Sequence, residues 1–156
     1  MDVPTAASRC QLPRVGKEMN QKQAHLEMIQ GVVNRLSSNS FLLKGWSVVL
    51  VSALFALAAA NAKAQFVYLA YFPAIAFWVL DGYFLWQERI FRALYDGVRQ
   101  MKEEEIDFSM DTSTVKGRVS PWSDVILSMT LLLFHGTVVV SIVVVTVMTR
   151  MIEKGD

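Results

Sequence analysis

The sequence has very little cysteine, and this scarcity excludes two kinds of stabilising site. Cys10 is the only cysteine among 156 residues. A disulfide within the chain therefore cannot form, and neither can a metal site built from several cysteines. An excess of positive charge is also missing, because 15 Lys and Arg stand against 14 Asp and Glu. This balance is not typical of nucleic-acid-binding proteins, and we expect no nucleic-acid partner.

Common catalytic and cofactor motifs are absent as well. The sequence contains no glycine-rich phosphate loop, no His-Glu-x-x-His motif, and no set of Ser, His and Asp that we expect to meet on one surface. We therefore predict no catalytic residue, no bound metal and no cofactor, and we expect that the protein is not an enzyme. The first forty residues show no signal-peptide pattern, so residues 1–19 are predicted to form a flexible cytoplasmic N-terminus.

Apolar sequence is abundant, since 53% of the residues are hydrophobic. Three long apolar runs each approach the roughly 20 residues that a helix needs to cross a bilayer. Because lipid offers no hydrogen-bond partners to the backbone, such runs must be helical. We predict an all-α integral membrane protein. Its three transmembrane helices are predicted at about 41–61, 66–87 and 121–150, with a cytoplasmic linker at 102–120 and a C-terminal tail at 151–156.

The distribution of basic residues predicts the orientation in the membrane. Of the 15 Lys and Arg, only Lys63, Arg150 and Lys154 lie on the side that follows the first or third span. The other twelve lie before the first span, just inside it, or between the second and third spans. Because cytoplasmic segments retain Lys and Arg, we predict a cytoplasmic N-terminus and a C-terminus on the opposite side of the membrane.

The first two spans are predicted to form an antiparallel helical hairpin, because the segment joining them is too short for another arrangement. Lys44 and Asp81 lie about 18 or 19 positions on either side of the turn, and therefore at nearly equal depth. One interpretation is an ion pair just below the cytoplasmic surface. The alternative is that Lys44 extends to the lipid headgroups while Asp81 contacts cytoplasmic water.

The hairpin is predicted to continue into the cytoplasm, so that residues 20–101 form one helical unit. Apolar residues recur there at three- and four-residue steps, which is typical of amphipathic or coiled helices in water. The Ser and Asn cluster at residues 37–40 favours a helix break before the first span. The two predicted seams, which we expect to cover each other, consist of Leu26, Ile29, Val33 and Leu36, and of Phe91, Leu94, Val98 and Met101.

Several polar or small residues inside the predicted spans are candidates for function or packing. His135 lies near the centre of the third span, where it could relay protons or line a pore. The alternative is a neutral imidazole bonded to a backbone carbonyl, Ser or Thr on a neighbouring helix. Pro73 is predicted to bend the second span and is a candidate hinge. Small residues predict a close-packing face on the first span at Ser52, Ala56 and Ala60.

Residues His25–Arg35, Asn39–Trp46 and Asp81–Arg89 resemble a family of small, largely uncharacterised bacterial membrane proteins. The order of cytoplasmic helix, two spans and cytoplasmic helix also resembles the SLATT-type two-span effectors of antiphage defence. The third span has no counterpart in that two-span pattern. The resemblance implies a pore-forming or membrane-perturbing effector that stays silent until a partner signals. It also implies a location in the bacterial inner membrane, with a periplasmic or extracellular C-terminus.

Two functions of different classes follow from these observations. The first is an oligomeric membrane effector or pore that alters membrane permeability, with a homo-oligomer in the lipid bilayer and a soluble cytoplasmic protein or signal as partners. The second is a non-catalytic membrane anchor or adaptor that docks a soluble protein through its cytoplasmic helices. A small transporter is less well supported, because three spans lack the internal repeat that such folds usually display.

Overall fold

The computed structural model describes residues 20–61 and 65–155. The expected N-terminal segment 1–19, with Cys10, lies outside this part of the chain, as does Lys63. Within the described residues the only regular elements are helices, which confirms the all-α prediction. The elements are α1 (Gln21–Asn61), α2 (Gln65–Leu69), α3 (Tyr71–Gln100), the 3-10 helix η1 (Glu103–Glu105), α4 (Ser113–Lys116), α5 (Trp122–Ile126) and α6 (Met129–Gly155).

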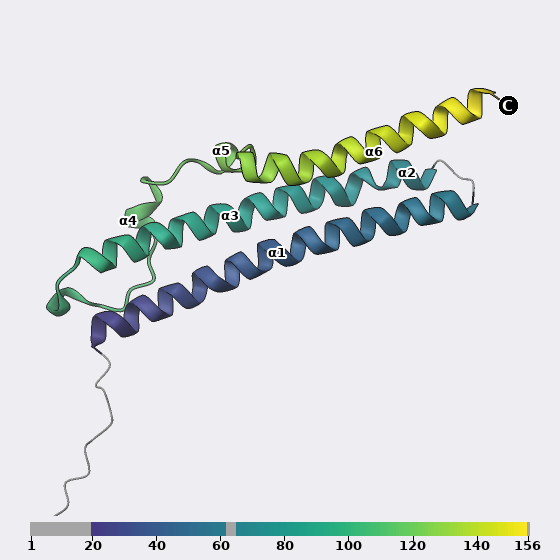
Figure 1. The fold of residues 1–156 in the computed structure, drawn as a ribbon. Helices are drawn as coiled ribbons and strands as arrows, with labels where there is room; N and C mark the ends of the chain where they lie inside the picture. Colours follow the sequence, from purple (N-terminus) through teal and green to yellow (C-terminus); the bar gives the residue numbers. More distant parts are fainter. Residues whose placement is uncertain (1–19, 62–64, 156) are drawn as a thin grey trace, which may run out of the picture.

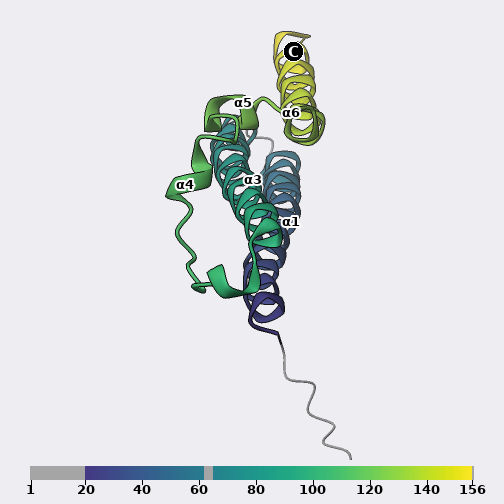
Figure 2. The same cartoon turned by 90° about the vertical axis from the view of Figure 1, so that its left-hand side faces the viewer.

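Three long helices form an elongated rod (Figure 1). The helices α1 and α3 run in opposite directions and pack against each other along most of their length. The helix α6 lies beside α3 over only one half of the rod, which we call the three-helix part (residues 41–61, 65–87 and 129–155). The other half, the two-helix part (residues 20–40 and 88–121), contains α1, α3 and the segment with η1 and α4. Seen from the end, α6 stands apart from α1 (Figure 2).

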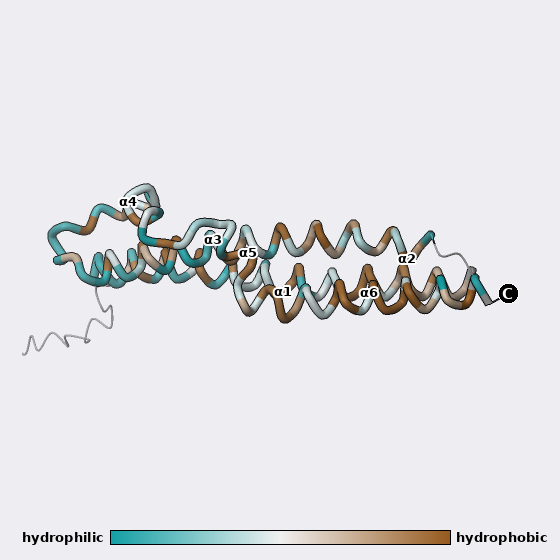
Figure 3. The backbone as a smooth tube through the Cα atoms, turned by 90° about the horizontal axis from the view of Figure 1, so that it is seen from above, coloured by the Kyte–Doolittle hydropathy of each residue, from teal (hydrophilic) through white to brown (hydrophobic). Residues whose placement is uncertain are grey.

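The two parts of the rod differ in polarity, as Figure 3 shows by hydropathy. The helix α1 has 41 residues and is therefore about 60 Å long, roughly twice the 30 Å thickness of a hydrocarbon core. Apolar residues concentrate in the three-helix part, and hydrophilic residues in the two-helix part. Three helices are long and apolar enough to cross a membrane, as the sequence predicts: Gln21–Ala60, Gln65–Gln100 and Met129–Ile152.

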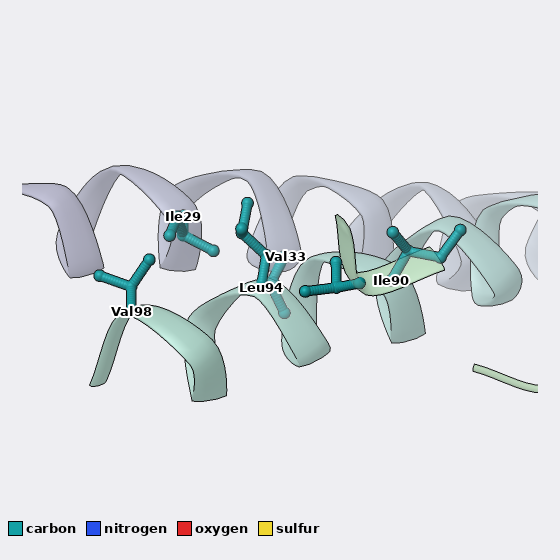
Figure 4. Packing of buried hydrophobic residues seen from close by; sticks show 6 residues of the cluster. Ile29, Val33, Ile90, Leu94 and Val98 are labelled. Atoms are coloured by element: carbon teal, nitrogen blue, oxygen red, sulfur yellow. The ribbon is translucent and has the colours of Figure 1, made fainter. Parts of the chain in front are cut away.

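A hydrophobic core holds the two-helix part together (Figure 4). Ile29 and Val33 from α1 pack with Leu94 and Val98 from α3, and all four are buried. These are the central residues of the two predicted seams. The outer seam residues contribute less to this core, since Leu26 and Phe91 are only partly buried at the edge of the core. Leu36 is also partly buried, and Met101 is 41% exposed.

The predicted linker is a structural part of this core. Val115 of α4 is buried in it, and other apolar residues of the same segment pack around it: Ile106, Met110 and Val119. Two helices alone leave one side of their shared seam uncovered. Residues 106–119, which we call the returning segment, cover this side and complete the core. The sequence pattern predicts that the two seams cover each other, but the structure shows that they need this third segment.

The predicted helix break at residues 37–40 is wrong, because α1 continues through this segment. Ser40 does not cap a new helix. Its hydroxyl donates a hydrogen bond to Asp81 Oδ1 on α3 and accepts one from Lys44 Nζ, one turn further along α1. Ser40, which by local sequence favours a helix start, thus makes its hydrogen bonds to Asp81 and Lys44 instead.

The predicted packing face of small residues is also wrong within one chain, because Ser52, Ala56 and Ala60 are exposed. The buried residue on this length of α1 is Val51, with Leu54, Phe55 and Ala58 beside it. Their partners are Val67 and Ala70 near the turn, Ala74 of α3, and Ile142 of α6.

The second and third predicted spans are both interrupted. The second is broken at Ala70, between α2 and α3, and Pro73 lies in the first turn of α3. The proline ring would clash with the carbonyl of residue 69, four positions earlier, so the break falls upstream of the proline. The third span is broken at residues 127–128, between α5 and α6, and α6 then continues through the predicted tail as far as Gly155.

The break between α5 and α6 is fitted to α3. The indole Nε1 of Trp78 donates a hydrogen bond to the carbonyl oxygen of Ile126, at 3.0 Å. This bond satisfies a carbonyl at the end of α5. A Cβ atom on Gly82 would lie 3.0 Å from Ile126 Cγ1, so glycine permits the close approach of α5 to α3. These contacts fix the position at which α6 starts.

Candidate functional site: a buried cluster of charged residues

Lys44, Asp81 and His135 meet inside the three-helix part, each from a different long helix. The Nζ atom of Lys44 lies 2.6 Å from Asp81 Oδ2, and His135 Nε2 lies 2.9 Å from the same oxygen. The side chains of Asp81 and His135 are 0% and 1% exposed. We call these three residues, together with Ser40, the charge cluster.

Asp81 is the centre of the charge cluster, and its two oxygens accept three hydrogen bonds. Oδ1 accepts one from the Ser40 hydroxyl, and Oδ2 accepts one each from Lys44 Nζ and His135 Nε2. A carboxylate with three donors and an adjacent ammonium is favoured in its ionised form. It follows that His135 carries a hydrogen on Nε2, which donates to Asp81.

The imidazole ring of His135 is enclosed by aromatic side chains. The Trp78 indole stacks parallel to it, with ring centroids 5.9 Å apart and an interplanar angle of 5°. The Phe134 ring meets it edge to face, with centroids 5.0 Å apart. With Nε2 bonded to Asp81, Nδ1 is left buried without a hydrogen-bond partner.

Lys44 connects the charge cluster to its surroundings. Its side chain is 22% exposed, in contrast to the fully buried Asp81. The ammonium also donates to the Ser40 hydroxyl at 2.8 Å and lies 6.0 Å from the centroid of the Phe134 ring. Lys44 therefore has the most exposed side chain of the three charged or titratable residues in the charge cluster.

Two further polar atoms in this region are buried without a partner. One is the hydroxyl oxygen of Ser47, which follows Lys44 by about one turn of α1, and this residue is 0% exposed. The other is the hydroxyl oxygen of Ser128, seven positions before His135. Native proteins leave few buried polar atoms unpaired, so these two hydroxyls mark polar positions among mainly apolar neighbours.

A groove of about 430 Å³ lies between α1 and α6, beside the charge cluster. Its walls are mainly apolar, with Val51 and Phe55 from α1 and Leu133 and Phe134 from α6 among the lining residues. Hydroxyl groups line it as well, at Ser52, Thr137 and Ser141. The groove exists because α6 packs on α3 and not closely on α1.

The sequence located three members of the charge cluster, Lys44, Asp81 and His135, but neither Ser40 nor the full arrangement. Of the two interpretations of Lys44 and Asp81, the structure shows the ion pair. For His135 it shows neither a backbone carbonyl nor a Ser or Thr as the partner, but Asp81. His135 also lies in the second turn of α6 and not at the centre of a long span, because the break at residues 127–128 shortens the helix before it.

A second buried histidine, which the sequence did not indicate as important, lies in the two-helix part. His25 of α1 is 1% exposed, and its Nε2 donates to the carbonyl oxygen of Ser109 at 3.0 Å. Its ring also lies 5.5 Å from that of Phe108, the only described non-glycine residue with a positive φ, at 56°. Lys22 donates to the carbonyl of Met101, at the end of α3. These bonds hold the returning segment against α1.

The donor set of the charge cluster does not fit a metal ion. Within residues 20–61 and 65–155, no group of three or more His, Cys, Asp or Glu side chains is placed to hold one. Protein-family models, curated proteins and solved structures give no match to this chain. The function is therefore argued from the geometry of the site.

Proposed function

We propose that this protein spans a membrane with its three long helices and, as a homo-oligomer, alters the permeability of that membrane. The observation that carries the proposal is the buried charge cluster in the three-helix part. Ionisable groups are costly within a bilayer, and those that occur there commonly mark pathways for ions or protons. A purely structural contact between apolar helices does not need a Lys, an Asp and a His in one place.

Membrane insertion is supported by the surface of the three-helix part. Large apolar side chains there are exposed to a degree that is unfavourable in water, for example Phe72 at 75%, Met129 at 74% and Leu133 at 64%. In a bilayer the same side chains face lipid without cost. The bias of Lys and Arg supports a cytoplasmic N-terminus and a C-terminus on the opposite side.

Assembly of several chains is proposed because one chain offers only a partial path. The charge cluster lies at one end of the three-helix part, and the groove between α1 and α6 continues from it along apolar walls with a few hydroxyls. Three helices do not enclose a pore. Further copies, placed against α1 and α6, would close the open side of this groove.

The resemblance to SLATT-type effectors adds a biological setting to the proposal. In that setting the permeability change would serve bacterial antiphage defence, and a signal received by the two-helix part would start it.

The adaptor function receives less support from the structure. It requires the apolar seams of the cytoplasmic helices to be free for a soluble partner. Ile29 and Val33 are instead buried against Leu94 and Val98, and the returning segment covers the remaining side. A soluble protein would first have to displace that segment.

Purified protein in liposomes tests the proposed function. A potassium diffusion potential is imposed, and its decay is followed with a potential-sensitive dye. We expect wild-type protein to dissipate the potential and Asp81→Asn to slow the dissipation, because the variant disrupts the charge cluster. Asp96→Asn is the matched control, since Asp96 lies on the same helix and is exposed. An unchanged potential at every protein-to-lipid ratio would favour the adaptor.

A further inference from the structure

We propose that the ion handled by the charge cluster is the proton and that Nδ1 of His135 is the atom that receives it. This inference rests on the proposed change of permeability and names the ion concerned. It rests on the hydrogen-bond donors and acceptors of the charge cluster, among which the buried Nδ1 of His135 has no partner. The charge cluster offers no comparable binding position to a metal cation or an anion.

Metal cations are a poor fit to the charge cluster. A sodium, potassium or calcium ion needs several oxygen ligands, and the carboxylate of Asp81 already accepts three hydrogen bonds. The Lys44 ammonium, 2.6 Å from Asp81 Oδ2, would also repel a cation. An anion would have to displace Asp81 from Lys44, and Asp81 is held by two other donors as well.

A proton needs only one lone pair, and Nδ1 of His135 supplies it. Because Nε2 donates its hydrogen to Asp81, Nδ1 of the neutral ring is an acceptor. It is buried and has no partner among the described residues. The carboxylate on the opposite side of the ring stabilises the positive charge that a proton brings.

The transfer can be written as a balanced sequence. A proton binds to the Nδ1 lone pair and gives an imidazolium. The hydrogen on Nε2 then passes to Asp81 Oδ2, which becomes a carboxylic acid, and the ring returns to neutrality with its hydrogen on Nδ1. Asp81 releases its proton toward water on the Lys44 side, with the Ser40 hydroxyl as a neighbouring acceptor and donor. The starting tautomer returns when the ring turns away from Asp81, loses the hydrogen on Nδ1 to water on the groove side, gains one on Nε2 from the same water, and turns back.

Polar groups lie near the ring in two places. Asp81, Ser40 and the partly exposed Lys44 form the hydrogen-bonded group at Nε2. The groove lined by Ser52, Thr137 and Ser141 passes Phe134, the neighbour of His135 in sequence. Among the described groups, Asp81 is the titratable side chain bonded to His135, and Lys44 is bonded to Asp81 in turn. The aromatic neighbours of the ring, Trp78 and Phe134, have no titratable group.

Proton flux into liposomes tests this inference. An entrapped pH-sensitive dye reports the flux under a potassium potential set with valinomycin, and separate vesicles report potassium and chloride flux. His135→Gln is the decisive variant, because its side-chain amide can still donate to Asp81 but cannot carry a proton. We expect its proton flux to fall by about 100-fold, the lower end of what a positioned proton-transfer group contributes. Thr149→Ala, in the same helix and not among the residues that line the groove, is the matched control and should retain the flux.

Each contrary result has a distinct meaning. Full proton flux in His135→Gln would overturn the inference. Potassium or chloride flux as large as the proton flux in wild-type protein would overturn it as well, but would leave the proposed function intact. The absence of all ion flux would overturn both.

A measurement on wild-type protein serves if the variant does not fold. The chain has two histidines, so nitrogen-15 labelling of His gives two ring systems, and His25→Asn assigns them. We expect the neutral His135 ring to carry its hydrogen on Nε2 and a free lone pair on Nδ1. A resting His135 ring with its hydrogen on Nδ1 would overturn the inference.

Discussion

Asp81 and His135 are 54 positions apart in the sequence, yet a hydrogen bond of 2.9 Å between Asp81 Oδ2 and His135 Nε2 joins α3 to α6. This bond is one polar link between the α1–α3 pair and the third long helix, and the 3.4 Å contact between the Tyr71 hydroxyl and Thr146 Oγ1 is another. The indole of Trp78 reinforces it, since it stacks on His135 and also binds the carbonyl of Ile126 at the end of α5. One aromatic residue thus fixes both the ring of His135 and the start of its helix.

The link between Asp81 and His135 can be measured with a double-mutant cycle. We expect Asp81→Asn to destabilise the protein by about 3 kcal/mol, because it leaves Lys44 without its charged partner. We expect a coupling between Asp81→Asn and His135→Ala of about 1–2 kcal/mol, as for other residues in direct contact. Unfolding in mixed detergent micelles, followed by circular dichroism, provides the free energies. Additive effects of the two substitutions would show that the pair does not stabilise the fold.

The glycines give a second prediction, in which the same substitution has opposite effects at two positions of α3. Gly82→Ala would place a Cβ atom 3.0 Å from Ile126 Cγ1, and we expect a loss of about 1–3 kcal/mol from overpacking. Gly97→Ala meets no atom within 4 Å and should add up to about 1 kcal/mol through helix propensity. Thermal unfolding of both variants in one detergent checks this. Equal effects would mean that α5 does not pack closely on α3.

Much of the fold follows from local sequence pattern. The apolar runs predict the three long helices, and the three- and four-residue spacing predicts the buried seam at Ile29, Val33, Leu94 and Val98. The equal depth of Lys44 and Asp81 follows from counting residues on either side of a short turn. These predictions succeed because they need only helix geometry and one tight connection.

The remaining features depend on contacts that local pattern does not reveal. No short loop links α6 to α3, so the depth of His135 could not be counted from a turn. The break at residues 127–128 depends on Trp78 and Gly82, which lie more than 40 positions away. Ser40 appears as a helix cap in sequence because its partner, Asp81, lies on another helix.

The returning segment gives a third prediction, which concerns His25. His25→Ala removes the hydrogen bond to the Ser109 carbonyl and the contact with Phe108, so the segment at 106–119 should open more often. We expect amide hydrogen exchange there to rise by about fivefold, equivalent to roughly the 1 kcal/mol of one hydrogen bond. Gln23→Ala is the control, since Gln23 is exposed on the same helix. Equal exchange in both variants would show that His25 does not hold the segment.

The final prediction concerns pH and the same segment, at the start of α4. The backbone N–H and the hydroxyl of Ser113 both donate to the Asp111 carboxylate, and these bonds lower the pKa of Asp111 from its usual value. A lowered pKa in the folded state means that the carboxylate stabilises the turn above the usual pKa of Asp. That contribution is lost as pH falls through the lowered value. Carbon-13 NMR of labelled Asp in detergent should show Asp111 titrating below the usual value for an aspartate side chain. Ser113→Ala should raise the pKa of Asp111 toward its usual value, and an unchanged titration would contradict the role of the hydroxyl.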